Sequence, residues 1–584
     1  MRNALHPRTL VLCIAGALAL AACNRATDAP AADAPPATAT TATTPAPAST
    51  HAFAPGIEAA DFAEHVRVLA SDEFEGRAPG SVGEDKTVDY VVSQFKRMGL
   101  EPGNAGEWTQ VVPMTETTAN KATLDLTVAG KPHTLKFGDD MVIGTRTGQK
   151  HVEVKDSDVV FVGYGVDAPE QQWNDYAGLD VKGKTVVILV NDPGFHVDDP
   201  KLFEGRRMTY YGRWTYKFEE AARKGAAAAL IVHDDAGASY GWDVVRGSWS
   251  GAQFDLRASD DPAPRLPIQG WITGEQAKAL FAASGKDFDA LRKAANKRGF
   301  KAVPLDAKAT AAIDSTVVEK SSRNVVAKIR GTEKPDEAVV YLAHWDHLGK
   351  HAEETGDNIY NGAIDNATGV AGIMEIAGEF AKAPPKRSVL FLAVTLEESG
   401  LLGSKYYVAH PAVPLKDTVA AINIDAMSTA GPSKDMVVTG LGNSELDDVL
   451  KSITDKQGRV LHAEATPESG FYFRSDHFNF AKAGVPALYA EGGEDLVEGG
   501  TAAGRKAAEE YTEMRYHKPA DEFDPNWNLG GTVQDLQTLY QVGRTIADGD
   551  TWPNWREGNP FRAARDASRS GASTDAGADA GTTK

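Results

Sequence analysis

Cysteine is nearly absent from this chain. Its two cysteines, Cys13 and Cys23, both lie close to the N-terminus. The rest of the chain therefore has no thiol for disulfides, redox chemistry or thiolate ligation of a metal. The helical zinc signature H-E-x-x-H is missing as well. Any metal ion would have to be held by histidines and carboxylates in another arrangement.

Long apolar runs and an excess of basic residues are also lacking. The apolar segment Leu10–Ala22 is too short to span a bilayer comfortably, and no later segment approaches that length. The formal net charge is −20. This balance argues against nucleic-acid binding, which leaves a basic footprint. It fits a protein that presents carboxylates to metal ions or to cationic groups of a substrate.

The N-terminus has the features of a targeting signal. Arg2 and Arg8 precede the apolar stretch, which ends in Leu20–Cys23 (LAAC). This tetrapeptide resembles the lipobox of bacterial lipoproteins. The resemblance implies cleavage before Cys23, lipidation of its thiol, and a membrane attachment through that lipid alone. Asn24, in place of aspartate, implies sorting to the outer membrane, facing the periplasm. A plain secretory signal peptide is the alternative.

Differences in composition divide the rest of the chain into segments. A stretch rich in alanine, proline and threonine follows Cys23, and a stretch rich in alanine, serine, glycine and aspartate closes the chain. From about Val154 to Val303, short strands alternate with glycine- and aspartate-rich turns. We predict a signal peptide (1–22), a disordered tether (23–52), a discontinuous catalytic domain (53–150 and 306–562), an inserted β-rich domain (151–305) and a disordered tail (563–584).

Three short apolar runs end in side chains that can bind a metal. Such runs are typical of buried strands in a parallel sheet, and ligands bind beyond the carboxyl ends of those strands. With helical segments between them, they predict an α/β fold: a mostly parallel central sheet flanked by helices, with the inserted β-rich domain. The runs are AVVYLA before His344, VLFLAVTL before Glu397-Glu398, and VAAINI before Asp425.

Other candidate residues lie near these strand ends or far downstream. Asp346 could accept a hydrogen bond from the His344 imidazole and fix its tautomer. Asp365 begins a predicted helix, where a plain N-cap is the alternative role. His517 lies in a downstream loop. The segment Gly492–Glu513, rich in glycine and charge, is expected to be a loop near the site.

Together, His344, His517 and three carboxylates can hold two metal ions. One bridging carboxylate would leave each ion one histidine and one terminal carboxylate, with the ions about 3.5–4 Å apart. The adjacent acids Glu397 and Glu398 can divide their work, one as a ligand and one as the base that takes a proton from water. This nitrogen and oxygen set suits zinc, and also manganese or cobalt.

The ordered motifs resemble those of the dizinc aminopeptidase family, which includes bacterial and vacuolar aminopeptidases, glutamate carboxypeptidase-type enzymes and the transferrin receptor. Within the predicted insert, Asp158–Leu230 is similar to a protease-associated domain. The early loop Leu69–Ser81 also matches such members. The motifs are His344-x-Asp346, Gly362-Ala363-x-Asp365-Asn366, Glu397-Glu398-x-Gly400-Leu401-x-Gly403-Ser404, Asn423-x-Asp425 and Tyr516-His517.

The resemblance implies a role for each residue. His344 and Asp425 would bind one zinc, Glu398 and His517 the other, and Asp365 would bridge them. Asp346 would orient His344, Glu397 would be the general base, and Tyr516 would donate its hydroxyl to the tetrahedral oxyanion. Arg474, before a segment that lines the pocket in this family, is a candidate substrate contact.

The function expected from the sequence is a zinc-dependent exopeptidase that removes N-terminal residues from peptides. A carboxypeptidase or dipeptidase of the same fold is one alternative, although only Arg474 and Arg515 lie near the motifs to bind a carboxylate. A catalytically silent binding protein is another, but such proteins usually lose metal ligands. A glutaminyl-cyclase-like enzyme with one zinc is a third, which the complete bridging set disfavours.

Overall fold

A computed structural model describes residues 51–570, except for 198, 262 and 352–354. The predicted signal peptide, the lipid-bearing Cys23, all but two residues of the predicted tether and residues 571–584 lie outside the described part. Within that part, no helix has the length and apolar character needed to cross a membrane.

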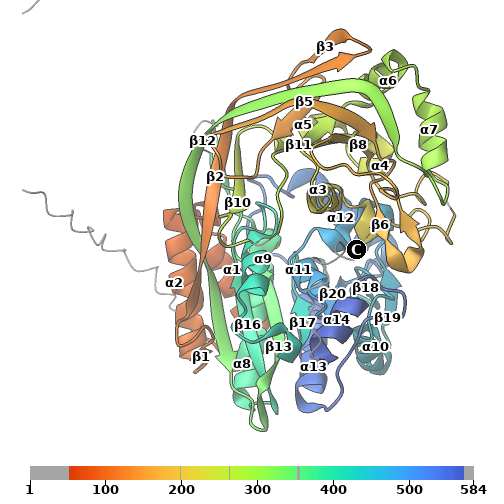
Figure 1. Cartoon of the computed structure of the whole chain (residues 1–584). Helices are drawn as coiled ribbons and strands as arrows, with labels where there is room; N and C mark the ends of the chain where they lie inside the picture. The colour runs from red at the N-terminus through yellow and green to blue at the C-terminus, as the bar shows by residue number, and fades with distance from the viewer. Residues whose placement is uncertain (1–50, 198, 262, 352–354, 571–584) are drawn as a thin grey trace, which may run out of the picture. The chain divides into compact units, whose positions relative to one another are not determined.

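The predicted parallel sheet is present (Figure 1). Strand β13 lies between β16 and β17, and β17 pairs next with β20; all three pairings are parallel. Strands β12 and β18 pair antiparallel with β16 and β20. The bounds are β12 Val303–Ile329, β13 Lys334–His344, β16 Arg387–Val394, β17 Thr418–Asn423, β18 Asp435–Val438 and β20 Ala487–Gly492.

Helices cover both faces of this sheet because its central strands are apolar on both sides. In β13, Val339, Tyr341 and Ala343 join one core, while Val340 and Leu342 join the other. Successive side chains of a strand point to opposite faces, so a continuous apolar run needs cover on each. The first core contains α1 Ala59–Leu69, α2 Val82–Arg97, α8 Thr368–Lys382, α10 Leu446–Gln457 and α13 Gly530–Asp548, and the second α9 Leu402–Ala409 and α11 His477–Lys482.

The inserted segment continues the same sheet. Strand β12 pairs with β16 at its C-terminal end and with β5 at its N-terminal end, and it runs beside the long strand β2 (Figure 1). Beyond β5, the strands β8, β9 and β11 add in parallel. Their bounds are β2 Thr109–Val128, β5 His151–Phe161, β8 Thr185–Leu189, β9 Ala228–Val232 and β11 Ile268–Ile272.

The predicted boundaries of the insert are too narrow. Leu124, Leu126 and Met141 lie before residue 151 and Ile313 lies after residue 305, yet all four belong to the core of the insert. Strand β12 crosses the predicted boundary at residue 305, and its partner β2 lies wholly before residue 151. The change in composition therefore does not coincide with the change in packing. The insert also contains more helix than a β-rich domain implies: α3 Trp214–Arg223, α6 Gly274–Ala283 and α7 Phe288–Ala295 pack on its sheet.

The predicted tail begins too early, and the predicted tether ends too late. Helix α14 (Arg562–Ser570) occupies the start of the tail, because buried Arg565 donates hydrogen bonds to the carbonyls of Thr418 and Val419. At the other end, His51 lies 2.6 Å from Asp61 in α1, so the packed chain already includes the last tether residues.

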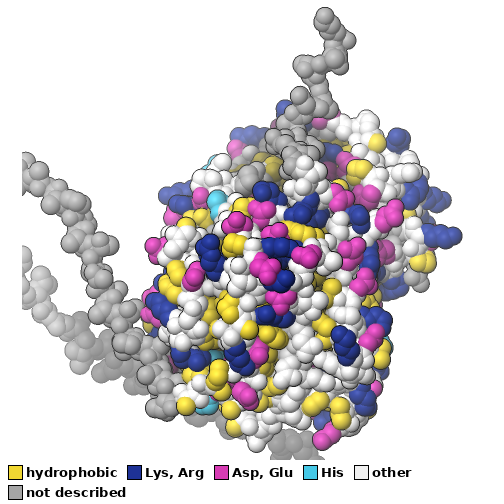
Figure 2. Space-filling view, turned by 90° about the horizontal axis from the view of Figure 1, so that it is seen from below, with side chains coloured by type: hydrophobic (Ala, Val, Ile, Leu, Met, Phe, Trp, Pro, Cys, Tyr) yellow, Lys and Arg dark blue, Asp and Glu magenta, His cyan; other side chains and the backbone are white. Residues whose placement is uncertain are grey.

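The segment Gly492–Glu513 is not a loop throughout. It contains most of α12, which spans Gly500–Met514 and is exposed along most of its length. Its alanine, lysine and glutamate residues favour helix even without a buried face. On the molecular face in Figure 2, acidic and basic side chains are interspersed, so the negative net charge is not concentrated there.

Candidate metal centre

Three neighbouring strands end at the same level and carry predicted ligands. His344 is the last residue of β13, Glu397 and Glu398 follow β16, and Asp425 follows β17. In the register of β13 and β16, His344 pairs with Val394, the last residue of its strand. The structure therefore brings these side chains to one edge of the sheet.

The Asp365 carboxylate lies between two imidazoles that are far apart in the sequence. Its Oδ1 is 3.2 Å from Nε2 of His344, and its Oδ2 is 3.2 Å from Nε2 of His517. The same nitrogen of His344 lies 3.2 Å from Oδ1 of Asp425, and that of His517 lies 3.3 Å from Oε2 of Glu398. All five residues predicted as ligands are thus in one cluster.

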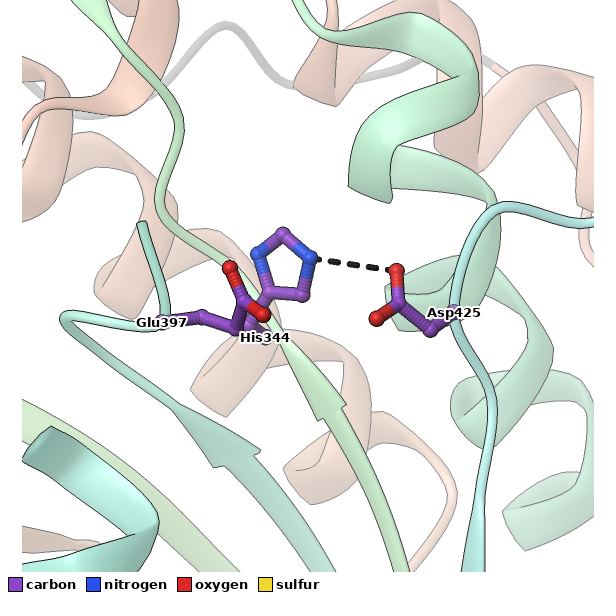
Figure 3. Close-up of side chains that lie close together, drawn as sticks. All are labelled: His344, Glu397 and Asp425. Carbon is purple, nitrogen blue, oxygen red and sulfur yellow. Dashed lines mark hydrogen bonds and ion pairs between the residues drawn. The ribbon is translucent and has the colours of Figure 1, made fainter. Parts of the chain in front are cut away.

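Glu397 belongs to the half of the cluster around His344. Figure 3 shows the His344 ring between the carboxylates of Glu397 and Asp425. These three residues offer ligand atoms within 4.8 Å of one another. Burial raises the pKa of Glu397 well above its usual range, and the carboxylates of Glu398 and Asp425 act in the same direction. The protonated form of Glu397 is therefore favoured when no metal ion lies beside it.

The carboxylates determine the charge of the imidazoles in their midst. Burial alone would lower the pKa of His344, but Asp425 and Glu397 raise it well above the ordinary value. Burial likewise opposes ionisation of Asp365, yet hydrogen bonding to His344 and His517 holds its pKa well below the usual range. The cluster is thus a concentration of negative charge that attracts cations.

Asp346 contacts His344 in a different way from the predicted one. Nδ1 of His344 lies 3.1 Å from the backbone carbonyl of Asp346 and 3.9 Å from its carboxylate. The buried carboxylate instead accepts a hydrogen bond from the backbone N–H of Glu397. Asp346 thus fixes the ring through its main chain and the loop of the paired glutamates through its side chain.

Two carboxylate ligand candidates are held by partners that the sequence did not single out for this role. Ser475 donates a 2.5 Å hydrogen bond to Oδ2 of Asp425, and Asn423 donates to the Ser475 hydroxyl. Asp521, fully buried, accepts hydrogen bonds from the backbone N–H groups of Ile364 and Asp365. Such partners fix the orientation of ligand side chains.

A third imidazole, His347, was missed in the sequence. It is 1% exposed, its Nδ1 lies 2.7 Å from Oε1 of Glu398, and its Nε2 has no hydrogen-bond partner. His347, Asp365 and Glu398 offer ligand atoms within 4.8 Å of one another. The only signal was its position three residues after His344, which resembles many unrelated histidines.

Tyr516 lies at the rim of the cluster, and Arg474 interacts electrostatically with Tyr516. The Tyr516 ring stacks on His517 with centroids 4.0 Å apart, and its side chain is 45% exposed. Partial burial and the nearby carboxylates, Asp365 foremost, raise its pKa, so it stays protonated and able to donate. Arg474 is half-buried, donates to the Ser469 carbonyl and lies over the Phe471 ring.

The donor set fits zinc. It is partly buried, and it contains only imidazole nitrogens and carboxylate oxygens. Fold and cluster together define a class: an α/β protein with a site for metal ions at the carboxyl edge of its sheet.

Comparison with known proteins finds similarity to one peptidase family over this part of the chain. Residues 324–540 match the model of peptidase family M28. A probable zinc metalloprotease of Pyrenophora teres f. teres is 35% identical over 219 residues, which are 37% of this chain and 40% of that protein.

Two further similarities extend over more of the chain. The probable glutamate carboxypeptidase AMP1 of Arabidopsis thaliana is 24% identical over 416 residues, 66% of this chain and 54% of that protein. The matches therefore span about half the length of these two curated relatives. The solved aminopeptidase from Aneurinibacillus sp. strain AM-1 is 20% identical, with a TM-score of 0.47, covering 85% of this chain and 95% of that one.

Proposed function

We propose that this chain is a zinc-dependent exopeptidase with two zinc ions per chain, which removes N-terminal residues from peptides. His344 and Asp425 would hold one ion, Glu398 and His517 the other, and Asp365 both. The match of residues 324–540 to the model of peptidase family M28 supports the class of reaction. The spacing of the donor atoms in the site supports two metal ions.

The observation that carries the proposal is the spacing of the donor atoms. Ligands at about 2.0–2.1 Å in a tetrahedral zinc site lie roughly 3.3 Å from one another. Four separations around Asp365, from the two imidazoles to the three carboxylates, are 3.2–3.3 Å. Nδ1 of His347 and Oε1 of Glu398, only 2.7 Å apart, are too close to be two ligands of one ion. This contrast favours His517 over His347 as the second histidine ligand.

The remaining residues have tasks that follow from their positions. When bound, zinc supplies positive charge that acidifies water, polarises the peptide carbonyl and favours the ionised form of Glu397. Glu397 accepts the proton of the attacking water and passes it to the leaving amine. Tyr516, protonated and at the rim, donates its hydroxyl to the oxyanion of the tetrahedral intermediate.

The cluster of carboxylates at the site favours a substrate with a free amino group. Glu491 on β20 is a further acid near Asp425: burial and then the Asp425 carboxylate raise its pKa to about 8, and a cation bound beside it would favour its ionised form. A peptide α-ammonium group placed beside these carboxylates would be stabilised by them.

Hydrolysis of a peptide panel tests this specificity. One peptide is offered with both ends free, with its N-terminus acetylated and with its C-terminus amidated, each with zinc and with chelator. We expect cleavage of the free and amidated forms, none of the acetylated form, and none with chelator. If the acetylated peptide is cleaved and the amidated peptide is not, the aminopeptidase proposal is contradicted. If no peptide is cleaved, the result favours a binding protein.

A second candidate function, carboxypeptidase action, is favoured by one observation. Arg213 of the insert lies near Arg474, and burial together with that neighbour lowers the pKa of Arg213 to about 10. The Nε atoms of both guanidiniums are buried without a hydrogen-bond partner. Buried positive charge of this kind can be neutralised by a substrate carboxylate. The name of the Arabidopsis relative, a probable glutamate carboxypeptidase, agrees with this alternative.

Separate replacement of the two candidate histidines tests the ligand assignment. We expect His517→Ala to retain about one zinc per chain, because it removes the nitrogen that faces Asp365 and Glu398. His347→Ala should keep both ions and lose only about 10–100-fold in zinc affinity, as expected when an outer partner is removed. Zinc counted by atomic spectrometry distinguishes them, and the reverse pattern would make His347 the ligand.

A further inference from the structure

Arg77, in the loop between α1 and α2, is a cation buried behind the metal centre. Its side chain is 1% exposed. Its guanidinium donates four hydrogen bonds, and each acceptor is a backbone carbonyl. The acceptors are the carbonyls of Leu69 at 2.8 Å, Trp345 at 2.8 Å, Asn361 at 2.5 Å and Gly362 at 2.8 Å.

These carbonyls belong to the segments that carry the ligand candidates. Trp345 directly follows His344, and Gly362 comes three residues before Asp365. The main chain of Arg77 also takes part, because its carbonyl accepts a hydrogen bond from the His347 backbone N–H. One guanidinium thus joins the loop of the first histidine to the loop of the bridging carboxylate, and ties both to the end of α1.

The charge of Arg77 faces the same cluster. Burial lowers the pKa of its guanidinium to about 10, while the carboxylates of Asp521, Asp365, Asp346 and Glu398 act against that shift. Because carbonyls are its acceptors, this positive charge remains available to the acids of the cluster.

We propose that Arg77 is a positioning residue of the metal centre, which fixes the loop after His344 against the loop before Asp365. The 3.2 Å separation between His344 and Asp365 then depends on a guanidinium that touches neither of them. This inference rests on the proposed two-zinc function, and it adds a residue outside the ligand set.

Lysine cannot replace Arg77 in this role. The guanidinium presents several donors in a rigid fork, whereas an ammonium group is a compact point charge on a flexible stem. In Arg77→Lys we expect zinc affinity to fall by about 10–100-fold, as when an outer partner of a metal ligand is lost. With zinc in excess, kcat should still fall by about 10²-fold because the reacting groups are misplaced, with KM little changed.

Arg565→Lys is the matched control. Arg565 is also buried and also donates to main-chain carbonyls, those of Thr418 and Val419, which begin the strand that Asp425 follows. It therefore has the same kind of contacts at the opposite end of the sheet. Zinc affinity is measured by chelator competition, alongside Tm, kcat and KM on a peptide that the wild type cleaves.

The proposal holds if both variants lose similar Tm but only Arg77→Lys loses zinc affinity. Wild-type zinc affinity in Arg77→Lys, or an equal loss in both variants, would overturn it. If Arg77→Lys does not fold, Asn361→Ala replaces it, because Asn361 donates to the carbonyl of Ala70 and to Asp72 and so joins the same loops. Unchanged zinc affinity in folded Asn361→Ala would also overturn the proposal, and a weakened one would support it.

Failure of the proposed function would look different. A wild-type chain that binds no zinc, or binds it and cleaves no peptide, contradicts the exopeptidase. If the wild type binds zinc and cleaves peptide, and Arg77→Lys behaves like it, only the proposed role of Arg77 is contradicted.

Discussion

Glu397→Gln is expected to keep its zinc and to lose turnover by about 10²–10⁴-fold, the usual contribution of a general base. Glutamine keeps the shape of the side chain but cannot accept the proton of water. The residue lies beside His344 and Asp425, which are candidate ligands of one ion. Steady-state kinetics with zinc counted in the same sample measure both quantities.

The neighbouring substitution Glu398→Gln is the matched control. Its carboxylate lies 3.3 Å from His517, so the expected defect is loss of zinc from one position. The two substitutions should therefore have different defects: Glu397→Gln loses turnover, and Glu398→Gln loses zinc. Near-normal turnover of zinc-loaded Glu397→Gln would contradict the assignment of Glu397 as the base, and loss of zinc from this variant would make it a ligand.

Asp365→Asn is expected to reduce zinc at both positions and to abolish activity. Each oxygen of this carboxylate faces a different imidazole at 3.2 Å, so the change weakens both halves of the site at once. No other ligand candidate has this double effect in the proposed arrangement. Zinc content and binding affinity measured by chelator competition check the result.

Asp447→Asn provides a control for the loss of a buried aspartate. Asp447 is 8% exposed and accepts a hydrogen bond from the Gly442 backbone N–H, in a part of the fold that has no ligand candidate. It should retain full zinc. Loss of only one of two ions from Asp365→Asn would show that this carboxylate is a terminal ligand and would contradict the bridge.

The sheet and the ligand candidates were accessible from the sequence because each depends on local pattern. A continuous apolar run such as VLFLAV needs cover on both faces, and its end defines where a following Glu397 or Glu398 must lie. The parallel order of such strands then places their ends together. His517 was found only through the resemblance to a family, since nothing local distinguishes a histidine in a loop.

The supporting residues could not be predicted, because their roles depend on contacts across long sequence distances. Arg77 contacts carbonyls more than 260 residues away in the chain. Ser475 reaches Asp425 across 50 residues. A buried arginine in a polar loop and a serine before a short helix have no pattern that reveals such partners.

Helices with little buried surface were missed for a different reason. Composition indicated a loop for the segment that contains α12 and a disordered tail for the segment that contains α14. In α14 the buried guanidinium of Arg565 donates hydrogen bonds to main-chain carbonyls at the start of β17. An analysis of hydrophobic periodicity does not detect such a helix, because the helix contacts the rest of the protein through polar side chains.

The most direct test of the account is the number of zinc ions bound by the purified wild-type chain after saturation and removal of excess metal. The donor separations around Asp365 predict two ions per chain, both removed by chelator together with activity. A single ion per fully active chain would contradict the bridging role of Asp365 and with it the proposed two-metal site.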